Sequence, residues 1–149
     1  MRTTGIIAEY NPFHNGHAHQ IAKAKEMTGA DYCIIAMCGD FVQRGAPAVA
    51  DKYLRAETAL KNGADLVLEL PVYYALGSAE YFASGAVALF DRLGIVDALC
   101  FGSECGDIAV LSEFAASLID EDAVFKEVLD RHLRMGYAYP GARNAALRA

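Results

Sequence analysis

Residues 5–17 read Gly5-Ile6-Ile7-Ala8-Glu9-Tyr10-Asn11-Pro12-Phe13-His14-Asn15-Gly16-His17 and lead into an amphipathic helical pattern. The apolar run predicts a strand, and the residues after it predict a tight loop and a helix start. Pro12 fixes its own φ and favours an extended Asn11, so we expect a stiff loop. Asn15 is the expected N-cap of the helix. Because Gly16 has no Cβ, a ligand can approach the first free N–H groups of the helix there.

The two histidines at this helix start are the strongest candidates for binding chemistry. His14 and His17 are three residues apart, and the N-terminus of a helix attracts anions. Both imidazoles can donate hydrogen bonds to phosphate oxygens, so the pattern predicts a site for a nucleotide polyphosphate. Two other interpretations of H-x-x-H stay open, namely half of a metal site and a pair of histidines bound by neighbouring carboxylates. The preceding strand, Pro12 and Gly16 favour phosphate.

Strands and helices alternate along the chain. We expect strands at 4–8, 31–37, 66–70 and within 95–101, and helices at 16–28, between Asp51 and Asn62, between Ser78 and Gly94, at 107–118 and at 122–135. This alternation predicts a single α/β domain over residues 1–149, a Rossmann-like doubly wound parallel sheet with helices on both faces. In the strand order 3-2-1-4, the switch point lies between strands one and four, so Gly102 faces the histidines across a crevice.

Four motifs carry a resemblance to a known family. His14-Asn15-Gly16-His17 is similar to the H-x-G-H signature of the nucleotidyltransferase superfamily of the HUP type, whose members activate acids or phosphates with ATP. The chain departs from the G-x-F-D-P pattern of many members, and its Ala8-Glu9-Tyr10-Asn11-Pro12 agrees better with the bacterial tRNA(Met) cytidine acetate ligase family. The motifs that together resemble this family are Glu9-Tyr10-Asn11-Pro12-Phe13-His14-Asn15-Gly16-His17, Gly39-Asp40-Phe41-Val42-Gln43-Arg44-Gly45, Asn62-Gly63-Ala64-Asp65-Leu66-Val67-Leu68-Glu69-Leu70-Pro71 and Phe101-Gly102-Ser103-Glu104.

The resemblance implies an enzyme that forms acetyl-adenylate from ATP and acetate. The acetyl group then passes to the wobble cytidine of elongator tRNA(Met), giving N4-acetylcytidine. ATP is the implied cofactor, with Mg²⁺ expected beside it. His14 and His17 are the expected stabilisers of charge on the α-phosphate and on departing pyrophosphate. The expected ATP-binding residues are Ile7, Ala8, Glu9, Tyr10, Asn11, Pro12, Phe13, His14, Asn15, Gly16, His17, Ala18, His19, Gln20 and Gly102.

A second loop, Gly39 to Pro47, ends at the same edge of the predicted sheet. We expect Arg44 to neutralise a phosphate or carboxylate, and Asp40 to hold Mg²⁺ or orient a substrate group. A solvated loop without a role is the alternative. Lys52 and Arg55, just inside the next helix, are expected on a solvated face, where they can line the rim of the site and meet nucleic-acid phosphate.

Composition narrows the class of protein. No run of about 18 apolar residues occurs, and the first residues lead straight into a strand, so we expect a cytoplasmic protein without a membrane partner. The four cysteines form two C-x4-C pairs, Cys33 with Cys38 and Cys100 with Cys105. That spacing favours free thiols, with Cys33 and Cys100 in buried strands, over a zinc site.

The net charge of −6 argues that most of any affinity for tRNA lies elsewhere, because surfaces that bind RNA are basic. A helical pattern resumes after Gly136 and stops at Ala149, so we expect the N-terminal part of a longer protein. A further superfamily element, a Ser/Thr-rich turn ending in Ile-Arg, does not occur within the chain. Two alternatives to the ligase stay open, a small-molecule nucleotidyltransferase and a non-catalytic nucleotide-binding module. The choice of acetate rests on the resemblance alone.

Overall fold

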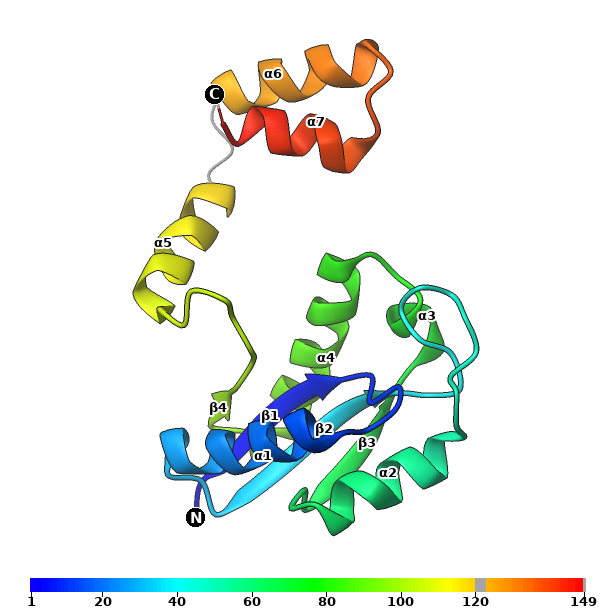
Figure 1. The fold of residues 1–149 in the computed structure, drawn as a ribbon. Coiled ribbons are helices and arrows are strands. Elements are labelled where there is room, and N and C mark those ends of the chain that lie inside the picture. Colours follow the sequence, from blue (N-terminus) through cyan, green and yellow to red (C-terminus); the bar gives the residue numbers. More distant parts are fainter. Residues whose placement is uncertain (120–122, 149) are drawn as a thin grey trace. The chain divides into compact units, whose positions relative to one another are not determined.

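The computed structural model describes residues 1–119 and 123–148, which divide into two compact units, Met1–Gly102 and Ser103–Ala149. The first unit contains a four-stranded parallel sheet in the order β3-β2-β1-β4 (Figure 1). The strands are β1 (Thr3–Ala8), β2 (Tyr32–Cys38), β3 (Leu66–Leu70) and β4 (Ala98–Leu99). Both the predicted α/β class and the predicted strand order are confirmed. β4 is a strand of only two residues at the edge.

Helices cover both faces of the sheet, as predicted (Figure 1). Alternate side chains of β2 face opposite ways, as the pleat of a strand requires. Cys33, Ile35 and Met37 lie in one apolar cluster with α1 (Asn15–Thr28) and α2 (Lys52–Lys61). Ile34, Ala36 and Cys38 lie in a second cluster with α3 (Val72–Ala75) and α4 (Ala79–Leu93). A central strand that is apolar on both faces is typical of a covered parallel sheet.

The register of the sheet fixes where its loops emerge. β1 pairs with β2 from Thr3 opposite Tyr32 to Ala8 opposite Met37, and β2 pairs with β3 up to Cys38 opposite Leu70. Because all the strands are parallel, the segments that begin at Glu9, Gly39 and Pro71 leave from the same edge. This carboxyl edge is where doubly wound sheets bind ligands.

The second unit is helical. It contains α5 (Ile108–Ile119), α6 (Ala123–Arg134) and α7 (Tyr139–Ala146). The predicted helices at 107–118 and 122–135 are confirmed in type, although position 122 lies outside the described residues. Phe125, Ala142 and Ala146 are the buried residues where α6 and α7 pack against each other. Within the described ranges, no helix is long and apolar enough to cross a membrane.

The four cysteines are free thiols, as predicted, but Cys100 does not lie in a buried strand as expected. Cys33 and Cys38 are buried in β2, and burial raises the pKa of each thiol to about 11. Cys100 is only half-buried because β4 ends at Leu99, one residue before it. Cys105 is exposed.

Truncating Phe90 tests the packing of the second cluster. Phe90 is 5% exposed, and its ring lies so close to β1 that a Cβ built on Gly5 would be 2.9 Å from Phe90 Cε2. Phe90→Ala should lower the free energy of unfolding by about 3 to 5 kcal/mol, the usual cost of a large core truncation. Phe101→Ala is the matched control, because Phe101 is 54% exposed and should cost below about 0.5 kcal/mol. Equal losses in chemical denaturation of both variants would contradict this account of the core.

Candidate nucleotide site

The N-cap of α1 is His14, not the expected Asn15. His14 has an extended backbone (φ −146°), and its Nδ1 accepts a hydrogen bond from the Gly16 N–H at 3.1 Å. In return, His17 Nδ1 accepts from the His14 N–H at 3.2 Å. This is the reciprocal arrangement of a capping box, with two imidazoles in place of the usual hydroxyl and carboxylate. The Gly16 N–H, which we expected to be free for a ligand, therefore already donates to His14.

This capping leaves each imidazole with one donor to offer. A ring nitrogen that accepts a hydrogen bond carries no proton, so in the neutral ring the proton is on Nε2. The His14 and His17 rings are stacked, with centroids 3.7 Å apart and an interplanar angle of 24°. Partial burial, and then the neighbouring His14, lower the pKa of His17. Two Nε2–H groups on stacked rings form a paired donor suited to phosphate oxygens.

Gly16 has a second role beside the histidines. A Cβ at this position would lie 2.9 Å from His14 Cε1 and 3.0 Å from His14 Nδ1. Any larger residue would therefore push the His14 ring away from the N–H that it caps. The Asn-Gly-His spacing is explained by this ring as much as by the approach of a ligand.

The ring of Tyr10 packs against the ring of His17. Tyr10 is 1% exposed and has a left-handed backbone (φ 48°), which is uncommon outside glycine. Its ring centroid lies 4.8 Å from those of both Phe13 and His17. Burial raises the pKa of its hydroxyl. The turn between β1 and α1 thus buries an aromatic ring that fixes where His17 sits.

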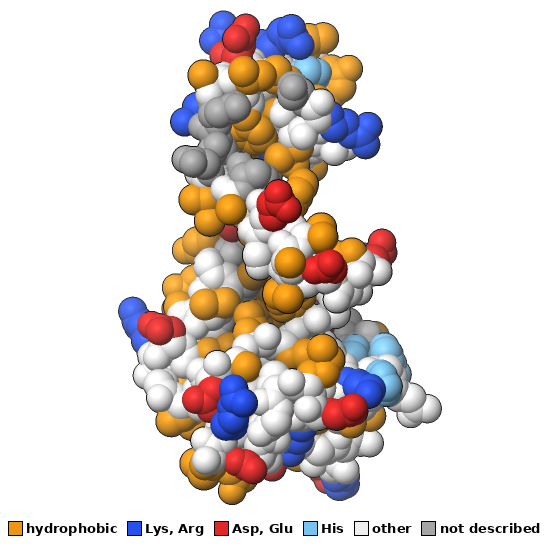
Figure 2. Space-filling view, turned by 90° about the vertical axis from the view of Figure 1, so that its left-hand side faces the viewer, with side chains coloured by type: hydrophobic (Ala, Val, Ile, Leu, Met, Phe, Trp, Pro, Cys, Tyr) orange, Lys and Arg blue, Asp and Glu red, His pale blue; other side chains and the backbone are white. Residues whose placement is uncertain are grey.

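A pocket of about 420 Å³ opens at this turn. This volume is within the range of ligand sites. The histidines of the first unit, all between residues 14 and 19, form a cluster on its surface in Figure 2. The lining residues, all from the expected stretch 7–20, are Ile7, Ala8, Glu9, Tyr10, Asn11, Pro12, His14, His17 and Gln20. The expected ATP-binding residues that do not line the pocket are Phe13, Asn15, Gly16, Ala18, His19 and Gly102.

The loop after β2 is tied to the turn after β1 rather than free in solvent. The Gln43 N–H donates to Glu9 Oε1 at 2.9 Å, and the Val49 N–H donates to Asn11 Oδ1 at 2.7 Å. A bridge between Phe41 and Pro47 closes the loop on itself. Two conspicuous polar residues of the strand-to-helix motif, Glu9 and Asn11, therefore hold the second loop against the first.

Asp40 and Arg44 lie on this second loop, and neither lines the pocket. Asp40 is 57% exposed, and its Oδ2 lies 3.9 Å from Lys52 Nζ. Arg44 is exposed, next to Gly45 at the turn of the loop. Lys52 Nζ is 2.7 Å from Oε2 of Glu69 in β3, so the charge of Lys52 is already paired with that carboxylate. Through the hydrogen bond with Glu69, the pKa of Lys52 is raised.

The sequence predicted that Arg55 lies on the rim of the site, and this prediction is wrong. Arg55 is 2% exposed, and it makes four hydrogen bonds, all to main-chain carbonyls. A guanidinium enclosed in this way cannot meet nucleic-acid phosphate. Within α2, the buried residues are Arg55 and Ala59, four residues apart, whereas Tyr53 is 76% exposed, and the local sequence carries no signal of this arrangement.

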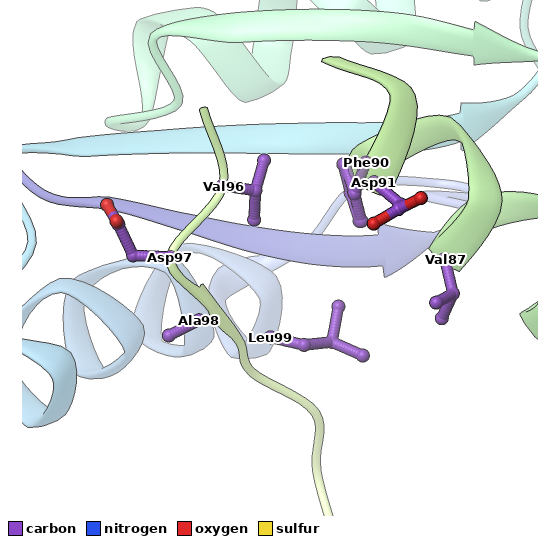
Figure 3. Close-up of a pocket in the computed structure, with 7 residues that line it drawn as sticks. All are labelled: Val87, Phe90, Asp91, Val96, Asp97, Ala98 and Leu99. Carbon is purple, nitrogen blue, oxygen red and sulfur yellow. The ribbon is translucent and has the colours of Figure 1, made fainter. Parts of the chain in front are cut away.

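A second hollow, of about 210 Å³, lies between α4 and β4 (Figure 3). Its lining is mostly apolar, and the carboxylates of Asp91 and Asp97 lie at opposite ends of it in this view. Asp97 Oδ2 already accepts from the Thr3 N–H at 2.7 Å. Without a cation among its lining residues, this hollow is a poor phosphate site. For metals, no cluster of three or more His, Cys, Asp or Glu side chains occurs in the described part of the chain.

Comparison with known proteins adds to this geometry. The profile of the HIGH nucleotidyl transferase family matches residues 1–149. This chain belongs to that family. Relatives named tRNA(Met) cytidine acetate ligase are 49% identical over 148 residues in Acetivibrio thermocellus and 49% over 147 residues in Fervidobacterium nodosum. Each match covers 99% of this chain but only 36% and 35% of those relatives.

A solved structure agrees with the same assignment. Thermotoga maritima TmcAL, crystallised with alpha-thio ATP, matches with a TM-score of 0.93 and 46% identity. The match covers 98% of this chain and 35% of that chain. The Rossmann-like nucleotidyltransferase fold and the resemblance inferred from the motifs are thereby confirmed. The chain spans about a third of the length of these relatives.

Acid should weaken the fold through His17. Its pKa is lower in the folded chain than the ordinary 6.5, so between the two values the unfolded chain binds the extra proton. This contribution to stability is present above about pH 6.5 and is lost as the pH falls towards the folded pKa. Thermal unfolding scans between pH 8 and pH 5 should show a shallower loss of Tm for His17→Asn than for the wild type. An identical pH dependence would contradict the inferred burial of the neutral ring.

Proposed function

We propose that the full-length protein is an ATP-dependent ligase that acetylates the wobble cytidine of elongator tRNA(Met). The observation that carries the proposal is the stacked pair His14 and His17, which line a pocket on the carboxyl edge of the sheet and whose Nε2 atoms bond to no residue in the described ranges. The relatives named tRNA(Met) cytidine acetate ligase and the alpha-thio ATP bound by T. maritima TmcAL support it.

The chemistry requires two transfers. An acetate oxygen attacks the α-phosphorus of ATP, the bond to the bridging oxygen breaks, and pyrophosphate leaves. The exocyclic amine of cytidine then attacks the acetyl carbon, AMP leaves and the amine loses a proton. In the first transfer, charge accumulates on the phosphate oxygens, where preorganised donors stabilise the transition state. We assign that task to Nε2–H of His14 and His17.

The remaining site residues enter the proposal in lesser roles. The pocket-lining residues of the stretch 7–20, together with Gly102, are proposed to bind the nucleotide. We propose that Arg44, on a loop tied to Glu9, meets an incoming anion and that Asp40 orients a substrate group. Lys52 is proposed as the rim residue that meets RNA phosphate. Because the whole chain carries a formal net charge of −6, most contacts with tRNA are assigned to a region of the full-length protein outside it.

Mg²⁺ is expected with ATP, held mainly by phosphate oxygens and water. The described residues offer no cluster that would cage it, so no residue here is assigned to the ion. None of the steps above depends on its position.

Nucleoside mass spectrometry tests the proposal. Elongator tRNA(Met) is incubated with the full-length protein, ATP, Mg²⁺ and labelled acetate. The proposal predicts labelled N4-acetylcytidine at the wobble position. ATP cleavage without modified tRNA would favour adenylyl transfer to another acid or phosphate. Nucleotide binding without any turnover would favour a non-catalytic module.

Replacing His17 tests the catalytic role assigned to it. His17→Ala in the full-length protein should cost about 3 kcal/mol of transition-state stabilisation, roughly a hundredfold in kcat/KM, as does the loss of one preorganised donor elsewhere. His19→Ala is the matched control, because His19 lies on the same helix, is exposed and does not line the pocket. Unchanged acetate-dependent turnover in His17→Ala would remove this histidine from the mechanism.

A further inference from the structure

Arg55 is a buried cation whose partners are all main-chain carbonyls. Its Nε donates to Ala50 O at 3.0 Å, one terminal nitrogen donates to Glu9 O at 2.6 Å and Cys38 O at 3.2 Å, and the other donates to Gly39 O. Burying a charge is costly unless it is fully hydrogen-bonded. A cation kept at this position therefore has a structural or functional reason.

The acceptors show what the cation connects. The β1–β2 ladder ends at the pair Ala8 and Met37, so Glu9 O and Cys38 O lie just past the last pair. One nitrogen of Arg55 binds both of these carbonyls and thus joins the two strands where their own pairing stops. The bond to Ala50 O adds the segment that enters α2. The guanidinium ties two segments that leave the carboxyl edge, after β1 and after β2, to the segment that enters α2.

The turn that follows Glu9 contains residues of the candidate nucleotide site. Four residues lie between Glu9, whose carbonyl Arg55 binds, and His14. Three of them, Tyr10, Asn11 and Pro12, line the pocket. The side chains of Glu9 and Asn11 in turn hold the second loop through Gln43 and Val49. A shift of Glu9 O would therefore move both loops together.

We propose that Arg55 is a positioning residue for the nucleotide site, acting through the carbonyl of Glu9 on the turn that carries His14 and His17. The inference rests on the proposed nucleotide binding at this turn. Arginine suits the task because its planar fork reaches several carbonyls at once, whereas lysine has one compact ammonium group. Arg55→Lys keeps the charge and loses the fork.

The test separates positioning from stability alone. In the full-length protein, Arg55→Lys is compared with Phe90→Leu, which perturbs the apolar cluster on the opposite face of the sheet. Both variants are measured at a temperature at which each is folded, first for the Kd of ATP without acetate or tRNA, then for kcat and KM. Arg55→Lys should weaken ATP binding roughly tenfold and also lower kcat, because about 1 Å of misplacement at a reacting centre costs up to roughly a hundredfold in rate. Phe90→Leu should bind ATP as the wild type does. ATP binding by Arg55→Lys equal to that of Phe90→Leu would overturn the proposal.

A second measurement needs no variant to fold. In the wild type, hydrogen exchange at the Arg55 Nε–H reports how firmly the three segments are held. ATP should slow this exchange severalfold if Arg55 and the nucleotide act on the same turn, and unchanged exchange at saturating ATP would overturn the proposal. If the wild type binds ATP but forms no N4-acetylcytidine, the ligase proposal fails while the Kd comparison still decides the role of Arg55. If ATP does not bind at all, both fail.

Discussion

The parallel ladder between β1 and β2 stops at Ala8 and Met37, so Glu9 and Cys38 lie beyond the last pair of that ladder. Buried backbone acceptors must be satisfied, and here one guanidinium binds Glu9 O, Cys38 O and Gly39 O together. The site is built outward from this constraint. Arg55 fixes the start of the first turn, and the side chains of Glu9 and Asn11 attach the second loop to it.

The histidine pair shows how one residue can serve both the fold and the chemistry. Each Nδ1 accepts a backbone N–H at the start of α1, which determines the tautomer and the orientation of the ring. Each Nε2 is then left as the donor. Burial of the Tyr10 ring behind His17 keeps the pair stacked, and the glycine between them leaves room for the His14 ring. Capping and phosphate binding use different atoms of the same imidazoles, so they need not compete.

Much of this was predictable from local pattern. The apolar runs, the turn after the first strand and the alternation of elements are properties of short segments, and they predicted the strand order and the motif that carries the family. The N-cap was assigned wrongly because asparagine is a common cap and histidine is not, whereas here the imidazole of His14 reaches the Gly16 N–H. Arg55 was placed on the surface because burial of a cation depends on carbonyls that only the folded sheet brings together. The half-burial of Cys100 likewise depends on where the pairing of β4 ends.

Under the proposal, His14 and His17 bind the phosphates of ATP through Nε2 while Nδ1 of each ring continues to cap α1. A high-resolution crystal structure of the full-length protein with alpha-thio ATP tests it most directly. The proposal predicts that Nε2 of both rings lies about 3 Å from phosphate oxygens, with the Nδ1 bonds to Gly16 N–H and His14 N–H intact. Phosphates bound away from the turn, or rings rotated so that Nδ1 meets the phosphate, would contradict it.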